Sequence, residues 1–242
     1  MKKIVLALLV FSSFLTFSQE EVLLRYNYKK GDKYLMEMTM KQNMGLAGGM
    51  DMKMDMHIEI TEVVSGKTTM TSQVKKVDTE VMQGGQTMKY NSEAKEEELD
   101  AFGKQMKAQM DPLMKVVSTY TFDQYGKVLE SKTEPSLGSN QTQIAYTNFP
   151  EKPVKVGSNW TTEQDQQGMK MKMTFTVKEI TATSVIADIS GTVNTMGIEG
   201  KLGGSTTINR ASGNSDVINL TISMSAQGMT ISMNSEVKMT KL

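Results

Sequence analysis

The sequence contains no cysteine and only one histidine, His57, among its 242 residues. The lack of cysteine excludes disulfide bonds, thiolate metal sites, cysteine nucleophiles and the lipidated cysteine of a bacterial lipoprotein. Any Ser-His-Asp relay or histidine-based zinc site would have to use His57. Its neighbours at alternate positions include Asp55 and Glu59. We therefore expect His57 to be a solvated residue on the polar face of a strand.

The chain also lacks an excess of charge of either sign. Its 27 Lys and Arg residues equal its 27 Asp and Glu residues, and no run of five basic residues occurs. Nucleic-acid binding normally needs such a basic patch, so we expect no nucleic-acid partner. The glycines at 45–49 and 197–204 do not lie between a strand and a helix, as a phosphate-binding loop requires. We predict that the protein is not an enzyme and that it needs no cofactor.

Long apolar runs are confined to the N-terminus. Lys2 and Lys3 precede an apolar run that begins at Ile4 and gives way to small residues near Ser18. The uninterrupted run is shorter than the roughly 18 to 20 residues of a membrane-spanning helix, and it has the form of a secretory signal peptide. We predict cleavage after Ser18, export to the periplasm or the medium, and no transmembrane segment in the mature chain, 19–242.

What the mature chain does contain is alternation of apolar and polar residues, the mark of half-buried strands. This period covers residues 34–40, 50–60, 218–224 and 229–239. Glycine-rich turns at 47–49 and 83–85 predict tight reversals between strands. The segments at 218–224 and 229–239 flank Gln227-Gly228, so we predict a terminal hairpin.

One stretch, from about Ser92 to Lys115, departs from the two-residue period. Its apolar residues recur at spacings of three and four, which predicts an amphipathic helix. Pro112 should end or kink this helix, because proline lacks the amide hydrogen and clashes with the preceding turn. The narrow apolar stripe must cover another part of the molecule; its members are Leu99, Phe102, Met106, Met110, Leu113 and Met114.

The segment from about 132 to 158 has no sustained period and is predicted to be a connection. The stretches on either side of it resemble each other, at 30–34 against 156–160 and at 52–62 against 169–179. This likeness indicates two similar halves, about 22–131 and 150–242, although any two Met-rich amphipathic strands would also align by parity. The predicted fold is a single all-β domain with one amphipathic helix, built as a curved antiparallel sheet or incomplete β-barrel.

The 23 methionines are the most informative feature of the composition. Three segments carry sulfur at every second residue, so that each set projects from one face of a strand. These candidate ligand-binding residues are Met36, Met38, Met40, Met52, Met54, Met56, Met169, Met171 and Met173.

Three roles for these methionines compete. They could be ordinary core, because the same faces continue into Ile58 or Phe175. They could form an adaptable lining for an apolar ligand, since Met is flexible and polarizable where a rigid core would favour Val and Ile. They could bind a soft metal such as Cu(I) through their thioethers. A sacrificial role as an oxidant sink is a fourth reading.

Motifs spread over most of the mature chain carry a resemblance to a known family. They are the segments at 28–34 (YKKGDKY) and 149–160 (FPEKPVKVGSNW), and Gly203-Gly204 ahead of 210–213 (RASG). They resemble a family of exported bacterial proteins of unknown function, found mainly in Bacteroidota. The resemblance implies a curved antiparallel sheet distantly similar to half-barrel carriers of lipoproteins and lipids. It offers no catalytic residues.

The sequence therefore favours an exported, non-enzymatic binding protein. Its partner is expected to be a lipid or another hydrophobic small molecule, held by the Met-lined face. The alternatives are a structural envelope domain without a small ligand and a Met-rich Cu(I)-binding protein. The sequence gives no indication of oligomeric state, and no metal site built from carboxylates or histidine is predicted.

Overall fold

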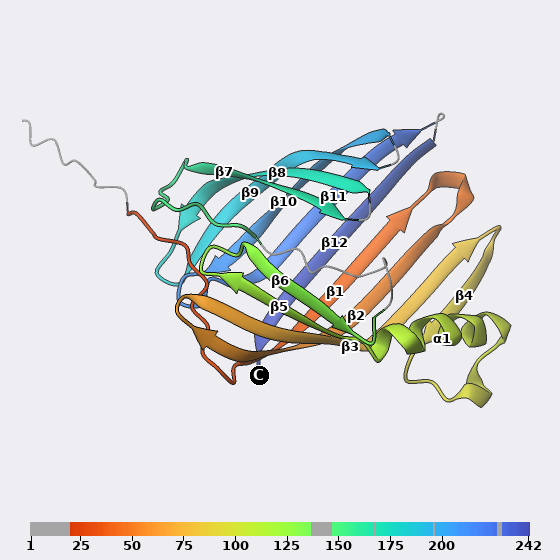
Figure 1. The fold of residues 1–242 in the computed structure, drawn as a ribbon. Coiled ribbons are helices and arrows are strands. Elements are labelled where there is room, and N and C mark those ends of the chain that lie inside the picture. Colours follow the sequence, from red (N-terminus) through yellow and green to blue (C-terminus); the bar gives the residue numbers. More distant parts are fainter. Residues whose placement is uncertain (1–19, 137–146, 167, 196, 227–228) are drawn as a thin grey trace, which may run out of the picture.

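The structure is a computed structural model that describes residues 20–136, 147–166, 168–195, 197–226 and 229–242. The predicted signal peptide, 1–18, lies outside the described residues. Most of the chain is strand (Figure 1). The strands are β1 (Lys33–Asn43), β2 (Gly49–Val64), β3 (Lys67–Gln83), β4 (Gln86–Asn91), β5 (Val117–Asp123), β6 (Val128–Glu134), β7 (Asn159–Gln166), β8 (Met169–Ile180), β9 (Ser184–Thr195), β10 (Ile198–Asn209), β11 (Ser215–Ala226) and β12 (Met229–Lys241).

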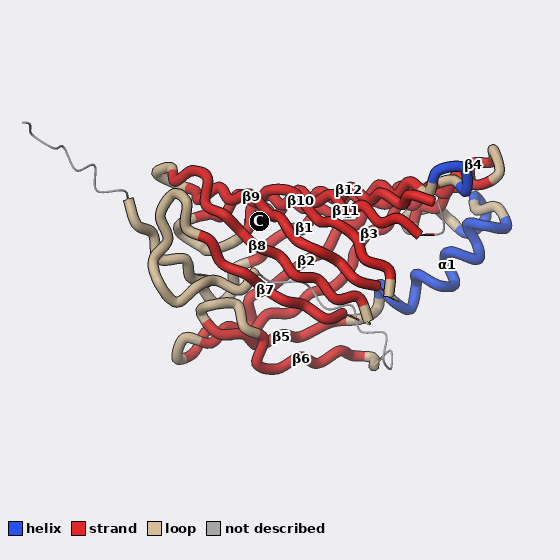
Figure 2. Tube along the Cα trace, turned by 90° about the horizontal axis from the view of Figure 1, so that it is seen from above, coloured by secondary structure: helices blue, strands red, loops and turns tan. Residues whose placement is uncertain are grey.

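These strands form one antiparallel sheet in the order β6-β5-β3-β2-β1-β12-β11-β10-β9-β8-β7, with β4 paired to β3. The first and last strands, β1 and β12, pair at the middle of the sheet, from Tyr34 opposite Lys241 to Asn43 opposite Ser232. The sheet curves but does not close, since β6 and β7 end the strand order (Figures 1 and 2). The predicted fold class, an open curved antiparallel sheet with one helix, is confirmed.

The helix is shorter than the sequence predicted. The structure has a short 3-10 turn, η2 (Glu96–Glu98), and then α1 (Ala101–Met114). A second 3-10 turn, η1 (Gly45–Ala47), forms the tip between β1 and β2. Residues 92–100 are thus not α-helical, because Asp100 acts as the N-cap and starts the helix there. Pro112 lies inside α1, which continues for two further residues before it ends.

The predicted connection from 132 to 158 also needs correction at its start. Residues up to Glu134 belong to strand β6, which pairs with β5. This edge strand is exposed along most of its length and buries Thr133 alone. An edge strand with little buried surface needs no apolar alternation, which is why its sequence did not indicate a strand.

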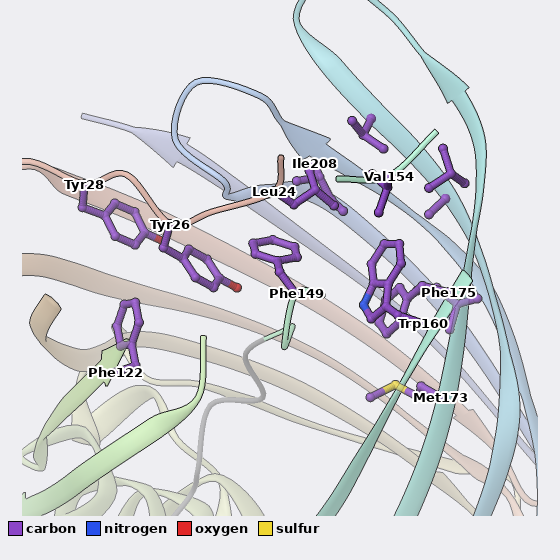
Figure 3. Close-up of a cluster of buried hydrophobic side chains, with 14 of the residues drawn as sticks. Leu24, Tyr26, Tyr28, Phe122, Phe149, Val154, Trp160, Met173, Phe175 and Ile208 are labelled. Atoms are coloured by element: carbon purple, nitrogen blue, oxygen red, sulfur yellow. The ribbon is translucent and has the colours of Figure 1, made fainter. Parts of the chain in front are cut away.

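An aromatic cluster fills one end of the concavity (Figure 3). The N-terminal segment enters here, and Val22 forms a β-bridge with Val154 through two 2.8 Å backbone hydrogen bonds. Trp160 stacks on Phe175 with 5.0 Å between ring centroids. The cluster consists of Tyr26, Tyr28, Tyr34, Phe122, Phe149, Trp160 and Phe175, all at most 9% exposed. We call this the closed end of the sheet.

The two halves of the chain enter the sheet through turns of the same geometry. Before β1, the amide of Gly31 donates to the carbonyl of Ile60 at 2.8 Å, and the amide of Ile60 donates to Asp32 at 2.9 Å. The register between β2 and β3 then shifts between Ile60 and Glu62.

The turn before β7 repeats this pattern at the aligned positions. The amide of Gly157 donates to the carbonyl of Val177 at 2.8 Å, and the amide of Val177 donates to Ser158 at 2.9 Å. The register between β8 and β9 shifts between Val177 and Glu179. Gly31 and Gly157 have nearly equal positive φ values, 87° and 86°. The duplication itself stays a prediction.

Candidate functional site

Methionines of β1 and β2 lie directly opposite one another across the strand pair. The register places Met36 opposite Met56, Met38 opposite Met54, and Met40 opposite Met52. Residues that are directly opposite in an antiparallel pair project from the same face of the sheet. Met36, Met54 and Met56 belong to or pack against the buried core. The shared face is therefore the concave one.

A pocket of about 290 Å³ lies over this face. That volume is at the lower end of the roughly 300 to 1,000 Å³ found for small-molecule sites. The lining is almost wholly apolar and comes from β1, β2, β3, the C-terminal part of α1 and the residues after it, β5, and the edge strand β6. The lining residues are Met38, Met52, Met54, Met56, Ser72, Gln73, Val74, Val77, Met110, Leu113, Met114, Val116, Ser118 and Thr133.

Helix α1 supplies one wall of the pocket, and a hydrogen bond stabilises each of its ends. At its start, the Asp100 carboxylate accepts a hydrogen bond from the amide of Gly103 at 2.7 Å. At its end, the Gln73 side-chain amide donates to the carbonyl of Met114 at 2.9 Å. Three residues of the predicted apolar stripe, Met110, Leu113 and Met114, face the pocket.

No ionisable side chain lines this pocket. Its polar groups are hydroxyls and one amide, from Ser72, Gln73, Ser118 and Thr133. His57 is exposed on β2, as predicted, and does not line it. Within the described ranges, no group of three His, Asp or Glu side chains could hold a metal ion. The chemistry available at the pocket is thus apolar contact, thioether ligation and hydrogen bonding by these few neutral groups.

The structure separates the predicted site residues into two groups. Met38, Met52, Met54 and Met56 line the pocket, and Met36 and Met40 flank it on β1. The methionines of β8 lie elsewhere, because β12, β11, β10 and β9 intervene between β1 and β8.

The β8 methionines pack in the same hydrophobic core, but on the other half of the sheet. Met173 is 7% exposed and lies opposite Gly191 on β9. Met169 and Met171 are partly buried against the same core. The nine predicted residues therefore share the concave side of the sheet but do not form one continuous patch.

Sequence reasoning missed the four pocket residues on β3, Ser72, Gln73, Val74 and Val77, of which the two valines are apolar. Val77 lies opposite Met54, and Val74 lies opposite Met56. Met54 and Met56 are two positions apart on β2, but their partners on β3 are three positions apart. The reason is that the register shifts between Asp55 and Met56. Such a bulge is invisible in a simple two-residue period.

Comparisons with known proteins give a fold but no family. No protein-family model matches the chain, and no curated protein matches it in sequence. A structure of lipovitellin, determined for lipid–protein interactions in that protein, is similar with a TM-score of 0.53 and 9% identity. The similarity covers 89% of this chain and 25% of the lipovitellin chain, so this protein spans about a quarter of that chain.

At this low identity the likeness concerns the fold alone. The resemblance to the exported bacterial family stays a prediction. No helix among the described residues has the length and apolar character to cross a membrane.

Proposed function

We propose that the protein is an exported, non-enzymatic binding protein that holds a lipid-like or other hydrophobic molecule in the pocket between β1–β3 and α1. The observation that carries this proposal is the pocket itself, about 290 Å³ in volume and lined by six methionines. Flexible thioether side chains can repack around ligands of different shape, which β-branched residues do less readily.

Two further observations support this proposal. A structural domain without a ligand would need no cavity, yet a pocket lies on the concave face beside α1. The fold is also similar to that of lipovitellin, a structure of which concerns lipid–protein interactions. The small volume favours a single slender apolar chain over a bulky multi-chain lipid.

The test is native mass spectrometry of protein purified from its own envelope, followed by titration of the stripped protein with a fluorescent fatty acid. We expect a co-purifying apolar species and saturable dye binding that the apolar species displaces. Leu113, 37% exposed on α1, lines the pocket, and its replacement by Glu should abolish dye binding without unfolding the sheet.

Val128→Glu is the matched control. Val128 is 43% exposed on β6 and does not line the pocket. This variant should bind the dye as the unmodified protein does. Equal dye binding by both variants, or no saturable binding by the unmodified protein, would contradict the proposal.

Cu(I) binding is the second candidate function, and one observation favours it. Met38, Met52 and Met54 come from adjacent strands and line one pocket, which a three-sulfur site requires. The β8 methionines cannot join this site, because four strands intervene. Titration with Cu(I) against a competing chelator distinguishes this function from ligand binding.

A further inference from the structure

A row of hydroxyl groups crosses three strands on one side of the pocket. Ser72 on β3 lies opposite Ser118 on β5, and Ser118 lies opposite Thr133 on β6. All three residues line the pocket. Residues directly opposite one another project from the same face of a sheet, so the three side chains form a continuous line. We call Ser72, Ser118 and Thr133 the hydroxyl row.

The hydroxyl row is largely buried and unpaired. Ser72 is 4% exposed, and Thr133, the one buried residue of β6, is 8% exposed. Among the described residues, none of the three hydroxyls has a hydrogen-bond partner, and none is fully enclosed by protein. On the opposite face of β3 and β5, the hydroxyls of Thr69 and Thr121 bond each other at 3.1 Å. Buried polar groups normally have partners, so unpaired hydroxyls beside a cavity indicate a ligand that supplies them.

The side-chain amide of Gln73, the other polar group of the pocket, is already engaged. Its nitrogen donates to the carbonyl of Met114 at 2.9 Å, and its oxygen accepts a hydrogen bond from the Lys75 ammonium at 2.5 Å. Gln73 therefore bonds the end of α1. The hydroxyl row is left to hydrogen-bond a bound molecule, and each hydroxyl can both donate and accept.

The charges around the pocket disfavour an anionic head group. No ionisable side chain lines the pocket. Lys132 and Glu134, the neighbours of Thr133 on β6, point to the other face of the strand, where they form an exposed ion pair. The pocket also lies at the C-terminal end of α1, where the last carbonyls carry partial negative charge. A carboxylate in the pocket would lose its hydration without gaining a cation.

We propose that the pocket selects molecules with an uncharged, oxygen-containing head, namely long-chain alcohols and esters. Their head bonds the hydroxyl row, and their chain contacts the methionines. The corresponding fatty acid still binds through its chain, but more weakly, because its carboxylate finds no cation. This inference rests on the proposed function, since it names the class of ligand for the same pocket.

Calorimetric titration of the stripped protein with decanol, methyl decanoate and decanoate tests this proposal. At neutral pH, decanol and methyl decanoate should bind at least about tenfold more tightly than decanoate. Lowering the pH towards the pKa of decanoic acid should raise the affinity for this ligand, because it becomes uncharged, and should leave the affinity for decanol unchanged. Equal affinities at neutral pH, or an affinity for decanoate that does not respond to pH, would overturn the proposal.

A triple variant, Ser72→Ala with Ser118→Ala and Thr133→Val, removes the three hydroxyls with little change in shape. It should bind decanol about tenfold more weakly than the unmodified protein, because the head group loses its hydrogen bonds. Diphenylhexatriene, an apolar dye without a head group, should bind equally to both proteins. Circular dichroism checks that the variant is folded, and the comparison of ligands in the unmodified protein does not depend on it.

The matched control is the double variant Thr69→Val with Thr121→Val. It removes the bonded pair of hydroxyls from the other face of β3 and β5, and neither residue lines the pocket. Its affinity for decanol should equal that of the unmodified protein. Equal loss of affinity in the double and triple variants, or no loss in the triple variant, would contradict the role of the hydroxyl row.

The dye separates this proposal from the function of the pocket. Saturable binding of diphenylhexatriene, together with equal affinities for decanol and decanoate, would leave the pocket function in place and overturn the choice of head group. Absence of saturable binding for the dye and for all three ligands would contradict the pocket function, and this inference with it.

Discussion

Met38 and Met54 lie directly opposite each other on β1 and β2, and both side chains line the pocket beside α1. This pairing explains why the methionine runs of two consecutive strands act together. A hairpin aligns residues of equal parity on one face, so that alternate methionines on both strands produce a continuous sulfur-rich surface. The same residues thus provide both the adaptable walls that an apolar molecule needs and the thioether groups that Cu(I) needs.

Replacing Met38, Met52 and Met54 together by Leu separates these two uses of the pocket. Each exchange keeps volume and apolarity, so it should change the free energy of unfolding by less than about 1.5 kcal/mol. Binding of the fluorescent fatty acid should be nearly unchanged, whereas Cu(I) binding should weaken strongly, because three of the six thioethers of the pocket are removed. Loss of dye binding from a variant that remains folded would show that apolar contact alone does not explain the site.

The N-cap of α1 should control how fast ligand leaves the pocket. Asp100→Ala removes the acceptor for the Gly103 amide and should destabilise the helix by about 1 kcal/mol. Because α1 forms one wall of the pocket, a bound fluorescent fatty acid should dissociate faster in a stopped-flow measurement. Asp100→Asn, which retains an N-cap acceptor, should release it at close to the original rate. Equal rates in all three proteins would mean that α1 does not gate the pocket.

Strand β9 should tolerate no side chain at Gly191. A Cβ atom there would lie 1.9 Å from the carbonyl oxygen of Lys172 on β8, so the backbones of the two strands would have to separate. We expect Gly191→Ala to lower the free energy of unfolding by about 1 to 3 kcal/mol, measured by urea denaturation.

Gly203→Ala is its matched control on β10. The nearest atom to a Cβ there is the Ile189 carbonyl oxygen at 3.9 Å, an ordinary contact distance. This exchange should be neutral or stabilise the protein by up to about 1 kcal/mol, because alanine restricts the unfolded chain. Equal destabilisation by both variants would show that loss of glycine, rather than the close approach of β8, is the cause.

Stability should fall at alkaline pH, in part because of Tyr34. Burial, and then the neighbouring Asp32 carboxylate, raises the pKa of the Tyr34 phenol to about 12. Between about pH 10 and about pH 12 the unfolded chain loses the Tyr34 proton while the folded protein keeps it, so the free energy of unfolding decreases as pH rises.

Urea denaturation across this pH range measures the effect, with Tyr34→Phe as the comparison. The variant should lose stability less steeply than the unmodified protein. The free energy of unfolding of the variant should still decrease somewhat as pH rises, because burial also raises the pKa of Tyr26. An identical slope in both proteins would mean that Tyr34 does not contribute.

Much of the architecture could be predicted from local pattern. The two-residue period identified β1, β2, β11 and β12, and the glycine turns marked two of their reversals, because side-chain alternation is a property of each strand alone. The stripe through Met110 and Leu113 predicted a helix that covers something apolar, as α1 does. The start of that helix was wrong by nine residues, since acidic and polar residues suit both a helix and an irregular segment.

Sequence by itself determined which face of each strand carries its methionines, because alternate side chains must point to opposite sides of a strand. Only the tertiary structure decided which of these faces meet. Pairing of β1 with β12 is a contact between the two ends of the domain, and it places β8 four strands away from β1. The curvature of the sheet and the docking of α1 then enclose Met38 and Met54, but not Met171, in the pocket. The sequence could not reveal this enclosure, because long-range packing, unlike side-chain alternation, leaves no period in the sequence.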